Sequence, residues 1–345
     1  MNFKLIYGFD ELLQAGWADF IASHPDGTVF QSPKMYELFS ATKQMKPVVV
    51  GLADAGNGAL KGILSGVIIR EMNGPAGYFS SRTVIYGGPL LDPGLADKGQ
   101  ILHLLLRELI REVKSRSIFI QFRNFNDQKD HREIFHESRF KLRDRLNLIV
   151  DTSSAEIVKK NMSASRIRQI KKGLELGAVY RAPKNTEEVR AFYEILKDLY
   201  RFKVKKPLPD WDFFEHFYRL TEENRLGIIR LVEYRDQIIG GILSPVTPGK
   251  TIYEWYVCGL DHEYREVHPS VLATWAAIEY AIKNNIPRFD FMGVGLPDRK
   301  YGVRDFKARF GGKMVNYGRF ARINNRTVYI VSEIGYNLLV WLKKI

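Results

Sequence analysis

The tetrapeptide Gly62-Ile63-Leu64-Ser65 occurs a second time in this 345-residue chain, as Gly241-Ile242-Leu243-Ser244. Each copy lies in the second of two β-rich runs joined by a short polar turn, a pattern that predicts a β-hairpin. The four runs are Val48–Ala53, Leu60–Glu71, Gly227–Tyr234 and Ile238–Pro245. The same tetrapeptide in two similar hairpins indicates an internal duplication.

The segments that follow the two hairpins also match. Each hairpin precedes another β-rich run, an amphipathic helix and a short strand. These pairs are Thr83–Leu91 and Thr251–Leu260, Leu102–Val113 and Val271–Ile282, and Ile118–Phe122 and Phe289–Phe291. Matching features lie about 170–180 residues apart. We therefore predict an α/β (α+β) protein of two tandem copies, each a mixed, mostly antiparallel sheet flanked by helices.

The spacing of the copies predicts the domain boundaries. Residues 155–220, which connect the two copies, are largely helical, with a break at Lys203–Pro209 because its prolines cannot continue a helix. We place the junction near Val150–Ser154. The predicted parts are an N-terminal domain (residues 1–150), a C-terminal domain (151–317) and a terminal strand and helix (318–345). Whether this last part packs back on the first domain is left open.

The basic residues are unevenly distributed. Lys and Arg number 52 against 39 Asp and Glu, a net charge of +13. Residues 159–206 hold 14 basic and 5 acidic residues, and residues 298–345 hold 11 and 3. These clusters predict a polyanionic partner for the second half, which is nucleic acid, a phosphorylated substrate or an anionic membrane surface. Solvated charge that keeps the protein soluble is the alternative.

Several classes of protein are excluded by the rare residues and by hydropathy. Cys258 is the single cysteine, so neither an internal disulfide nor a cysteine-based zinc site is expected, and the histidines show no metal-ligand spacing. No stretch approaches the length of a membrane span, and the N-terminus does not resemble a signal peptide. We expect a cytoplasmic protein. The mildly amphipathic tail, Tyr329–Ile345, either packs as a helix or contacts a membrane interface.

The second half carries a motif of a known family. Phe289-Asp290-Phe291-x-Gly293, followed by Gly302–Gly312 (GVRDFKARFGG), resembles the C-terminal signature of the FemAB group, which includes FemX-type aminoacyltransferases and Fem-like acyltransferases. Three shorter stretches match in order. They are Thr28–Ser32, Arg166–Gly177 and Tyr200-Arg201. The chain is too short for the helical arm of the larger members, so it resembles the compact ones.

The resemblance implies two GNAT-like domains in tandem and transfer of an acyl group to a primary amine. FemX-type members take the acyl group from aminoacyl-tRNA and pass it to a peptidoglycan precursor that carries a UDP or lipid diphosphate. The phosphate-binding lysine of their N-terminal domain has no certain counterpart here. Lys34 and Lys43 both lie near its place, and neither has the family's spacing.

Lys307 is the candidate catalytic residue. Aminolysis of an ester passes through a tetrahedral oxyanion, which a fixed cation stabilises by about 3–4 kcal/mol. The resemblance places Lys307 at the family's catalytic lysine, and we expect the rings of Phe306 and Phe310 to shield its charge from water. Lys307→Met is therefore expected to abolish transfer and leave folding intact. A surface lysine in a basic loop is the alternative.

Substrate binding is assigned to a cationic loop and to part of the signature. Arg201, Lys203, Lys205 and Lys206 follow a predicted helix and suit a diphosphate or a tRNA backbone, with a solvated loop as the alternative. We assign Arg304, within the signature, to the substrate as well.

Two tyrosines complete the predicted site. Thr251–Val257 alternates like a strand, which predicts Tyr253 and Trp255 on one face and Glu254 and Tyr256 on the other. Tyr253 and Tyr256 contact donor or acceptor, or pack in the core. Asp290 and Asp305 are both candidates for the proton acceptor, and the sequence does not favour either.

Acetyl-CoA is the less favoured donor. GNAT enzymes hold its pyrophosphate on a glycine-rich turn before a helix, because glycine permits close approach of the backbone. The corresponding junctions here, Arg265–Val271 and Asp92–Gln100, lack the motif.

We therefore expect a Fem-like N-acyltransferase that needs no metal or bound cofactor. Aminoacyl-tRNA is its expected donor, and a phosphorylated cell-envelope precursor, of peptidoglycan type, its acceptor. An acyl-CoA-dependent enzyme acting on an amino sugar of a surface polysaccharide or lipid is the first alternative. A non-catalytic protein that binds RNA or another polyanion is the second. DNA is not an expected partner, and peripheral contact with the inner face of the membrane is left open.

Overall fold

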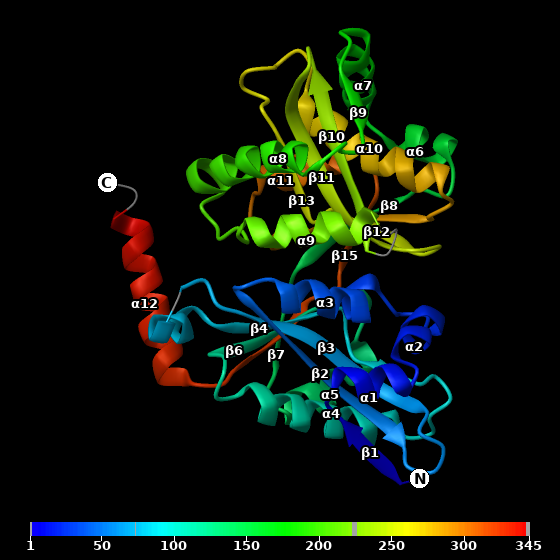
Figure 1. The fold of residues 1–345 in the computed structure, drawn as a ribbon, viewed down its shortest axis with the longest axis vertical. Helices are drawn as coiled ribbons and strands as arrows, with labels where there is room; N and C mark the ends of the chain where they lie inside the picture. The colour runs from blue at the N-terminus through cyan, green and yellow to red at the C-terminus, as the bar shows by residue number, and fades with distance from the viewer. Residues whose placement is uncertain (1, 73, 223–225, 343–345) are drawn as a thin grey trace. The chain divides into compact units, whose positions relative to one another are not determined.

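The computed structural model describes residues 2–72, 74–222 and 226–342. Contacts divide the chain into two compact units. The first is Met1–Arg143 with Tyr317–Ile345, and the second is Asp144–Asn316. Each unit has its own mixed sheet of eight strands with helices against it, so the predicted fold class is confirmed (Figure 1).

The sheet of the first unit has the order β1-β2-β3-β4-β6-β16-β7, with β5 beside β3. Its strands are β1 (Phe3–Ile6), β2 (Met45–Asp54), β3 (Leu60–Ile69), β4 (Arg82–Tyr86), β5 (Leu90–Leu91), β6 (Phe119–Arg123), β7 (Lys141–Arg143) and β16 (Arg319–Ile323). Neighbouring strands are antiparallel except β4 and β6, which are parallel. The predicted run Thr83–Leu91 is thus two short strands.

The sheet of the second unit has the order β15-β8-β14-β12-β11-β10-β9, with β13 beside β11. Its strands are β8 (Leu146–Asp151), β9 (Val179–Arg181), β10 (Gly227–Tyr234), β11 (Gln237–Thr247), β12 (Thr251–Tyr253), β13 (Tyr256–Gly259), β14 (Arg288–Gly293) and β15 (Lys313–Asn316). Among the described strands of this sheet, β12 and β14 are the one parallel pair of neighbours. Read from β9, this order repeats that of the first sheet, which confirms the duplication.

Helices of the first unit cover both faces of its sheet. They are α1 (Phe9–Gln14), α2 (Trp17–Ser23), α3 (Pro33–Ala41), α4 (Lys98–Val113), α5 (Arg132–Glu137) and α12 (Arg326–Leu342). Alternate residues of β2 face different cores: Val50 packs with the leucines of α4, and Val49 packs with α1 and α2. Figure 1 shows α3 and α4 on opposite sides of the strands.

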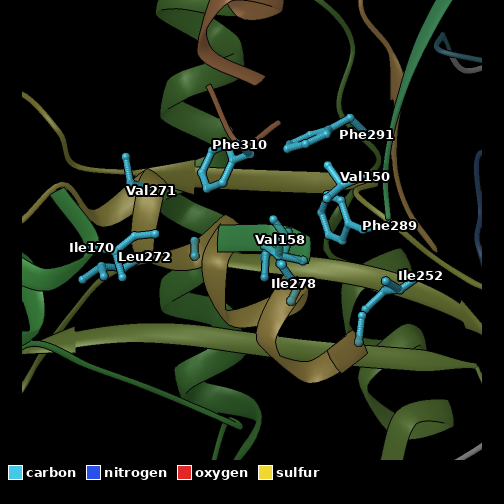
Figure 2. Packing of buried hydrophobic residues seen from close by; sticks show 14 of the residues in the cluster. Val150, Val158, Ile170, Ile252, Val271, Leu272, Ile278, Phe289, Phe291 and Phe310 are labelled. Atoms are coloured by element: carbon cyan, nitrogen blue, oxygen red, sulfur yellow. The ribbon is translucent and has the colours of Figure 1, made fainter. Parts of the chain in front are cut away.

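The second unit is built in the same way. Its helices are α6 (Ala155–Asn161), α7 (Ala164–Glu175), α8 (Thr186–Asp198), α9 (Trp211–Glu222), α10 (Pro269–Lys283) and α11 (Gly302–Ala308), with a π-helical turn at Leu199–Val204. The apolar face of α10 packs on the sheet together with α6 and α7 (Figure 2). Strand β9 was missed in the helical connection because it has only three residues.

Two strands belong to the sheet of the other half of the sequence. Strand β8 ends at the predicted junction, yet it pairs with β14 and β15 of the second unit. Strand β16 lies near the end of the chain and pairs with β6 and β7 of the first unit. The chain therefore passes from the first unit to the second after Arg143, seven residues before the predicted 150/151 boundary.

The two tetrapeptides do not occupy equivalent positions. In the β2–β3 hairpin, Gly62 pairs with Leu52 directly beside the register shift. A Cβ atom at Gly62 would contact the apolar face of α4. In the β10–β11 hairpin this place belongs to Gly240, which faces α10, whereas Gly241 faces α8. Because side chains alternate along a strand, this offset of one residue places the identical residues of the two tetrapeptides on opposite faces of their sheets. The duplication inferred from the tetrapeptides is correct, but their equivalence is not.

Hydropathy along the described helices gives no membrane span. None of the helices in residues 2–72, 74–222 and 226–342 combines the length and the apolar character needed to cross a bilayer. Helix α12 nevertheless presents large apolar side chains to solvent. These are Ile330, Val331 and Ile334.

Helix α7 packs closely on the start of α10 at Gly173, which provides a test of this contact. A Cβ at Gly173 would lie 2.4 Å from the carbonyl oxygen of Val267. We expect Gly173→Ala to lower the free energy of unfolding by about 1–3 kcal/mol, although alanine favours a helix, because the backbone of Val267 must shift.

Chemical denaturation of the purified variants measures this effect. Gly335→Ala in α12 is the matched control, since nothing lies within 4 Å of its Cβ position. Equal stability of Gly173→Ala and the unmodified protein would contradict the described packing.

Candidate active site

Lys307 lies on α11 and points into the second unit rather than to solvent. Its Nζ is 2.9 Å from Oε1 of Glu254, and it donates a hydrogen bond of 2.8 Å to the carbonyl oxygen of Phe291. Only 11% of the Lys307 side chain is exposed, and 2% of that of Glu254. The described contacts thus engage two of the three N–H donors of the ammonium group.

A bulge in β14 makes the Phe291 carbonyl available to Lys307. Pairing of β14 with β8 skips from Asp290 to Gly293. Between them Met292 has φ +56°, a left-handed conformation that is unfavourable for a side chain of this kind. Its N–H donates to Oδ1 of Asp290 at 2.6 Å. The bulge takes Phe291 out of the ladder, and Lys307 satisfies the carbonyl that the ladder leaves unpaired.

Glu254 connects this lysine to two further elements. Its backbone N–H donates to the carbonyl oxygen of Asp290 at 2.9 Å, and its Oε2 accepts a hydrogen bond of 3.3 Å from Thr274 Oγ1 on α10. The carboxylate is therefore fixed between β12, α10 and α11. Sequence reasoning did not select Glu254, although a lone acid inside an aromatic strand is an available signal.

Of the two candidate proton acceptors, the fold buries Asp290 and leaves Asp305 exposed on α11. Burial raises the pKa of Asp290 to about 6, against the stabilising effects of the Met292 N–H, the Asn147 side chain and the Lys307 charge. Asp290 is thus the candidate whose proton is exchanged near neutral pH, close to the ion pair.

The predicted aromatic shield of Lys307 encloses a different cation. The guanidinium carbon of Arg166 on α7 lies 4.4 Å from the ring centroid of Phe306 and 4.4 Å from that of Phe310. Arg166 also donates to the carbonyl oxygen of Phe306 at 2.7 Å. Lys307 contacts the ring of Phe291 instead, at 5.4 Å. The prediction was wrong here because Phe306 is adjacent to Lys307 on the helix and so points in another direction, and Phe310 lies beyond the end of α11 at Ala308.

Burial sets the electrostatics of Arg166. Its guanidinium is almost fully enclosed, and burial, together with the charge of Arg309, lowers its pKa to about 10. Nε of Arg166 has no hydrogen-bond partner among the described residues. The cation–π contacts and the Phe306 carbonyl therefore hold α7 to α11.

The predicted alternation along Thr251–Val257 is also wrong. Strand β12 ends at Tyr253 and β13 begins at Tyr256, so Glu254 and Trp255 fall in a break between two strands. The rings of Trp255 and Tyr256 stack at 5.6 Å, as they could not on opposite faces. Tyr253 is buried, and burial raises its pKa. Tyr256 is half-buried among aromatic rings, including that of Tyr200 at 6.2 Å.

The predicted phosphate-binding residues lie at two places. Arg201, Lys203, Lys205 and Lys206 are exposed in and after the π-helical turn. The neighbouring Tyr200 contacts Tyr256 at the start of β13, so the loop packs two residues away from Glu254, the partner of Lys307. Arg304 is half-buried and donates to the carbonyl oxygens of Val294, at 3.0 Å, and Leu296.

The start of α10, where a GNAT enzyme holds pyrophosphate, has its amides engaged within the chain. Pro269 has no N–H, and Ser270 N–H donates to Oδ1 of Asp261 at 3.2 Å. The N–H groups of Val271 and Leu272 donate to the carbonyl oxygen of His268 at 3.0 and 3.1 Å. A pyrophosphate would have to displace the Asp261 carboxylate, which also repels it.

In the first unit, the stretch matched by resemblance and the nearby Lys34 make contacts within the chain. The Gln31 side chain is fully buried, closes a capping box with Thr28 and donates to the carbonyl oxygen of Gly88 at 2.9 Å. Lys34 forms an ion pair of 2.7 Å with Glu37 on its own helix. Across the described part of both units, no group of His, Cys, Asp and Glu is arranged to hold a metal ion.

The buried carboxyl of Asp290 predicts a pH dependence of stability. Its folded-state pKa of about 6 lies above the ordinary 3.8, so the folded protein binds this proton more tightly than the unfolded chain. The protonated Asp290 carboxyl therefore contributes to the free energy of unfolding at low pH. This contribution, of up to about 3 kcal/mol, is lost as pH rises from about 4 to 6.

Urea denaturation across this pH range compares the unmodified protein with Asp290→Asn. Relative to the variant, the unmodified protein is expected to lose unfolding free energy as pH rises. Asp305→Asn, at an exposed position, is the control and keeps the pH dependence of the unmodified protein. Parallel curves for Asp290→Asn and the unmodified protein would contradict the assignment.

Comparison with known proteins agrees with this fold. Residues 162–308 match the acetyltransferase (GNAT) domain family. No curated protein matches the chain. The crystal structure of FemX superposes with a TM-score of 0.70 at 16% identity, over 96% of this chain and 99% of that one.

Two further structures are similar over almost the whole chain. L-PGS from Bacillus licheniformis has a TM-score of 0.57 at 10% identity, covering 92% of this chain and 95% of its own. A tandem GNAT protein from the clavulanic acid biosynthesis pathway has a TM-score of 0.57 at 10% identity, covering 94% and 99%. The resemblance found in the sequence is thus confirmed in the fold: the chain has the tandem GNAT fold seen in FemX, and residues 162–308 of its second unit match the acetyltransferase (GNAT) domain family.

Proposed function

We propose that this protein is an N-acyltransferase that moves an aminoacyl group from aminoacyl-tRNA to a primary amine of a phosphorylated cell-envelope precursor, of peptidoglycan type. The observation that carries the proposal is the ammonium group of Lys307. Inside the domain that matches the acetyltransferase family, Glu254 and the Phe291 carbonyl hold it at a fixed place of low exposure. A fixed cation of this kind suits a developing oxyanion.

In the proposed reaction the acceptor amine attacks the ester carbonyl carbon, and the new C–N bond forms as the carbonyl oxygen becomes an oxyanion. The described contacts use two of the three N–H groups of Lys307, and the third donates a hydrogen bond to this oxygen. When the intermediate collapses, the C–O bond to the ribose breaks, and the proton lost by the amine neutralises the leaving oxygen. Glu254 acts as a positioning residue, since it orients the ammonium group before substrate arrives.

The engaged amides at the start of α10 support an ester of tRNA as the donor rather than acyl-CoA. Asp261 occupies the place where a GNAT enzyme binds pyrophosphate. The cationic loop after α8 supplies exposed charge for phosphates of the donor or acceptor, as Arg201, Lys203, Lys205 and Lys206 all lie there. Tyr256 on β13 and Arg304 on α11 complete the proposed substrate surface, whereas Tyr253 is buried in the core and is not proposed as part of it.

A second candidate is an acyl-CoA-dependent N-acyltransferase acting on an amino sugar of a surface polysaccharide or lipid. The match of residues 162–308 to an acetyltransferase family favours it. The third candidate, a non-catalytic protein that binds RNA or another polyanion, would have no use for the buried ion pair beyond stability. We place the reaction in the cytoplasm, on the inner side of the membrane.

Lys307→Met tests the mechanism, but the structure changes what is expected of folding. Methionine would leave the buried Glu254 carboxylate without its partner, at a cost of about 3–5 kcal/mol in unfolding free energy. Folding is therefore expected to weaken in this variant, in contrast to the expectation from the sequence. We expect transfer to fall by a factor of at least about 100, together with this loss of stability.

The double variant Glu254→Gln with Lys307→Met separates the two effects. A neutral amide needs no cation, so the double variant should regain most of the lost stability and still lack transfer. Glu254→Gln alone keeps the ammonium group and is the matched control, with far more transfer than either variant lacking Lys307. Transfer by the double variant at the level of this control would show that Lys307 is structural only.

The donor is tested with the unmodified protein. We expect the protein to slow hydrolysis of the ester of charged tRNA and to transfer its aminoacyl group to an amine of a UDP-linked or lipid-linked precursor. Radiolabelled aminoacyl groups measure both effects. Acyl-CoA in place of charged tRNA should give no product, because Asp261 opposes pyrophosphate. Transfer from acyl-CoA alone would favour the second candidate.

A further inference from the structure

The cationic loop after α8 also exposes apolar side chains. In the turn Leu199–Val204, Phe202 is 66% exposed and Val204 is 36% exposed. Phe202 is the most exposed of the large hydrophobic side chains that the structure describes. The two side chains lie two residues apart in one turn, and exposed apolar side chains that occur together mark interaction sites more often than single ones do.

The loop is held in place at both ends. Before it, Tyr200 packs against Tyr256, and after it Pro207 and Pro209 restrict the backbone. Lys205 has φ +52°, so the chain turns sharply just beyond Val204. Phe202 and Val204 therefore form the projecting part of a constrained turn.

The charged residues within the loop have a single sign. Residues 199–209 contain four cations, Arg201, Lys203, Lys205 and Lys206, and no acid. The Arg201 guanidinium carbon lies 5.2 Å from the centroid of the Phe202 ring. Exposed aromatic and aliphatic side chains within a cationic segment are the composition of elements that enter the interface of an anionic bilayer.

We propose that this loop docks on an anionic lipid bilayer, with Phe202 and Val204 in the boundary between headgroups and acyl chains and the four cations at the lipid phosphates. The proposal deepens the phosphate-facing role of the loop and rests on it, but it does not require acyl transfer. A soluble nucleotide would engage the cations and leave both apolar side chains in water. A single-stranded RNA could stack on Phe202, but Arg201 already lies against that ring, and Val204 offers no stacking surface.

Helix α12 is the competing surface, since it also exposes apolar side chains. Its described exposed residues include Ile334, which is 62% exposed. The charges differ: residues 326–335 contain Arg326 and Glu333, which cancel, whereas residues 199–209 of the loop contain four cations and no acid. Attraction to anionic lipid is thus expected at the loop, where each basic residue near the surface adds to binding.

Vesicle sedimentation of the full chain tests the proposal. We expect binding to vesicles of phosphatidylcholine with about one third phosphatidylglycerol, and much weaker binding to phosphatidylcholine alone. Phe202→Ser should weaken binding by at least about tenfold, because a buried phenylalanine side chain is lost from the interface. Ile334→Ser removes an apolar side chain of similar exposure from α12 and should leave binding unchanged.

A fluorescent probe tests insertion at the residue itself. Cys258 is buried, and burial raises the pKa of its thiol, so a thiol reagent would label Val204→Cys selectively. An environment-sensitive dye at position 204 should shift to shorter wavelength on anionic vesicles. The same dye on Ala191→Cys, exposed on α8 of the same unit, should not.

Four outcomes would overturn the proposal. They are absence of binding to anionic vesicles, equal binding by Phe202→Ser and the unmodified protein, a loss confined to Ile334→Ser, and binding of single-stranded RNA through Phe202 without vesicle binding. The assays contain no acyl donor. If the proposed acyl transfer fails, the result of the vesicle assays is therefore unaffected. If vesicle binding fails, the proposal of acyl transfer is likewise unaffected.

Discussion

The buried ion pair between Lys307 and Glu254 organises the second unit. It joins α11 to the break between β12 and β13, while the same ammonium group satisfies the carbonyl of Phe291 in the bulge of β14. Because a charge inside a protein is costly without a partner, none of these elements can move far without exposing an unpaired group. The ion pair therefore requires the strand break, the left-handed Met292 and the inward face of α11 to occur together.

Lys307 therefore has a structural role in the core and a proposed catalytic role, and a variant that only removes the lysine cannot separate them. An ammonium group held by a carboxylate and a carbonyl is already oriented, so little reorganisation is needed when an oxyanion develops beside it. The same contacts make it part of the core. A second cation, Arg166, is held by carbonyl and ring contacts between α7 and α11, and so fixes the helix from its other side. The site is thus supported by two buried cations with different partners.

The duplication was predictable because two copies of one unit repeat the order of their elements, whatever their detailed sequence. The shared tetrapeptide indicated it, yet Gly62 corresponds in space to Gly240 and not to Gly241. Register depends on which face packs on a helix, and a four-residue match carries no such information. For the same reason the alternation expected for residues 251–257 failed at Glu254, where the strand breaks.

By itself, the sequence determined the two-copy architecture, most of the hairpins and long helices, the cationic loop and Lys307 as the residue of interest, since all of these follow from local patterns of hydropathy, charge and motif. Only the tertiary structure decided that Glu254 is the partner of Lys307, that Phe306 and Phe310 enclose Arg166, and that β8 and β16 belong to the sheet of the other half. These pairings join residues far apart in the chain. Packing and the need to neutralise buried charge select them, and neither is visible in a local sequence pattern.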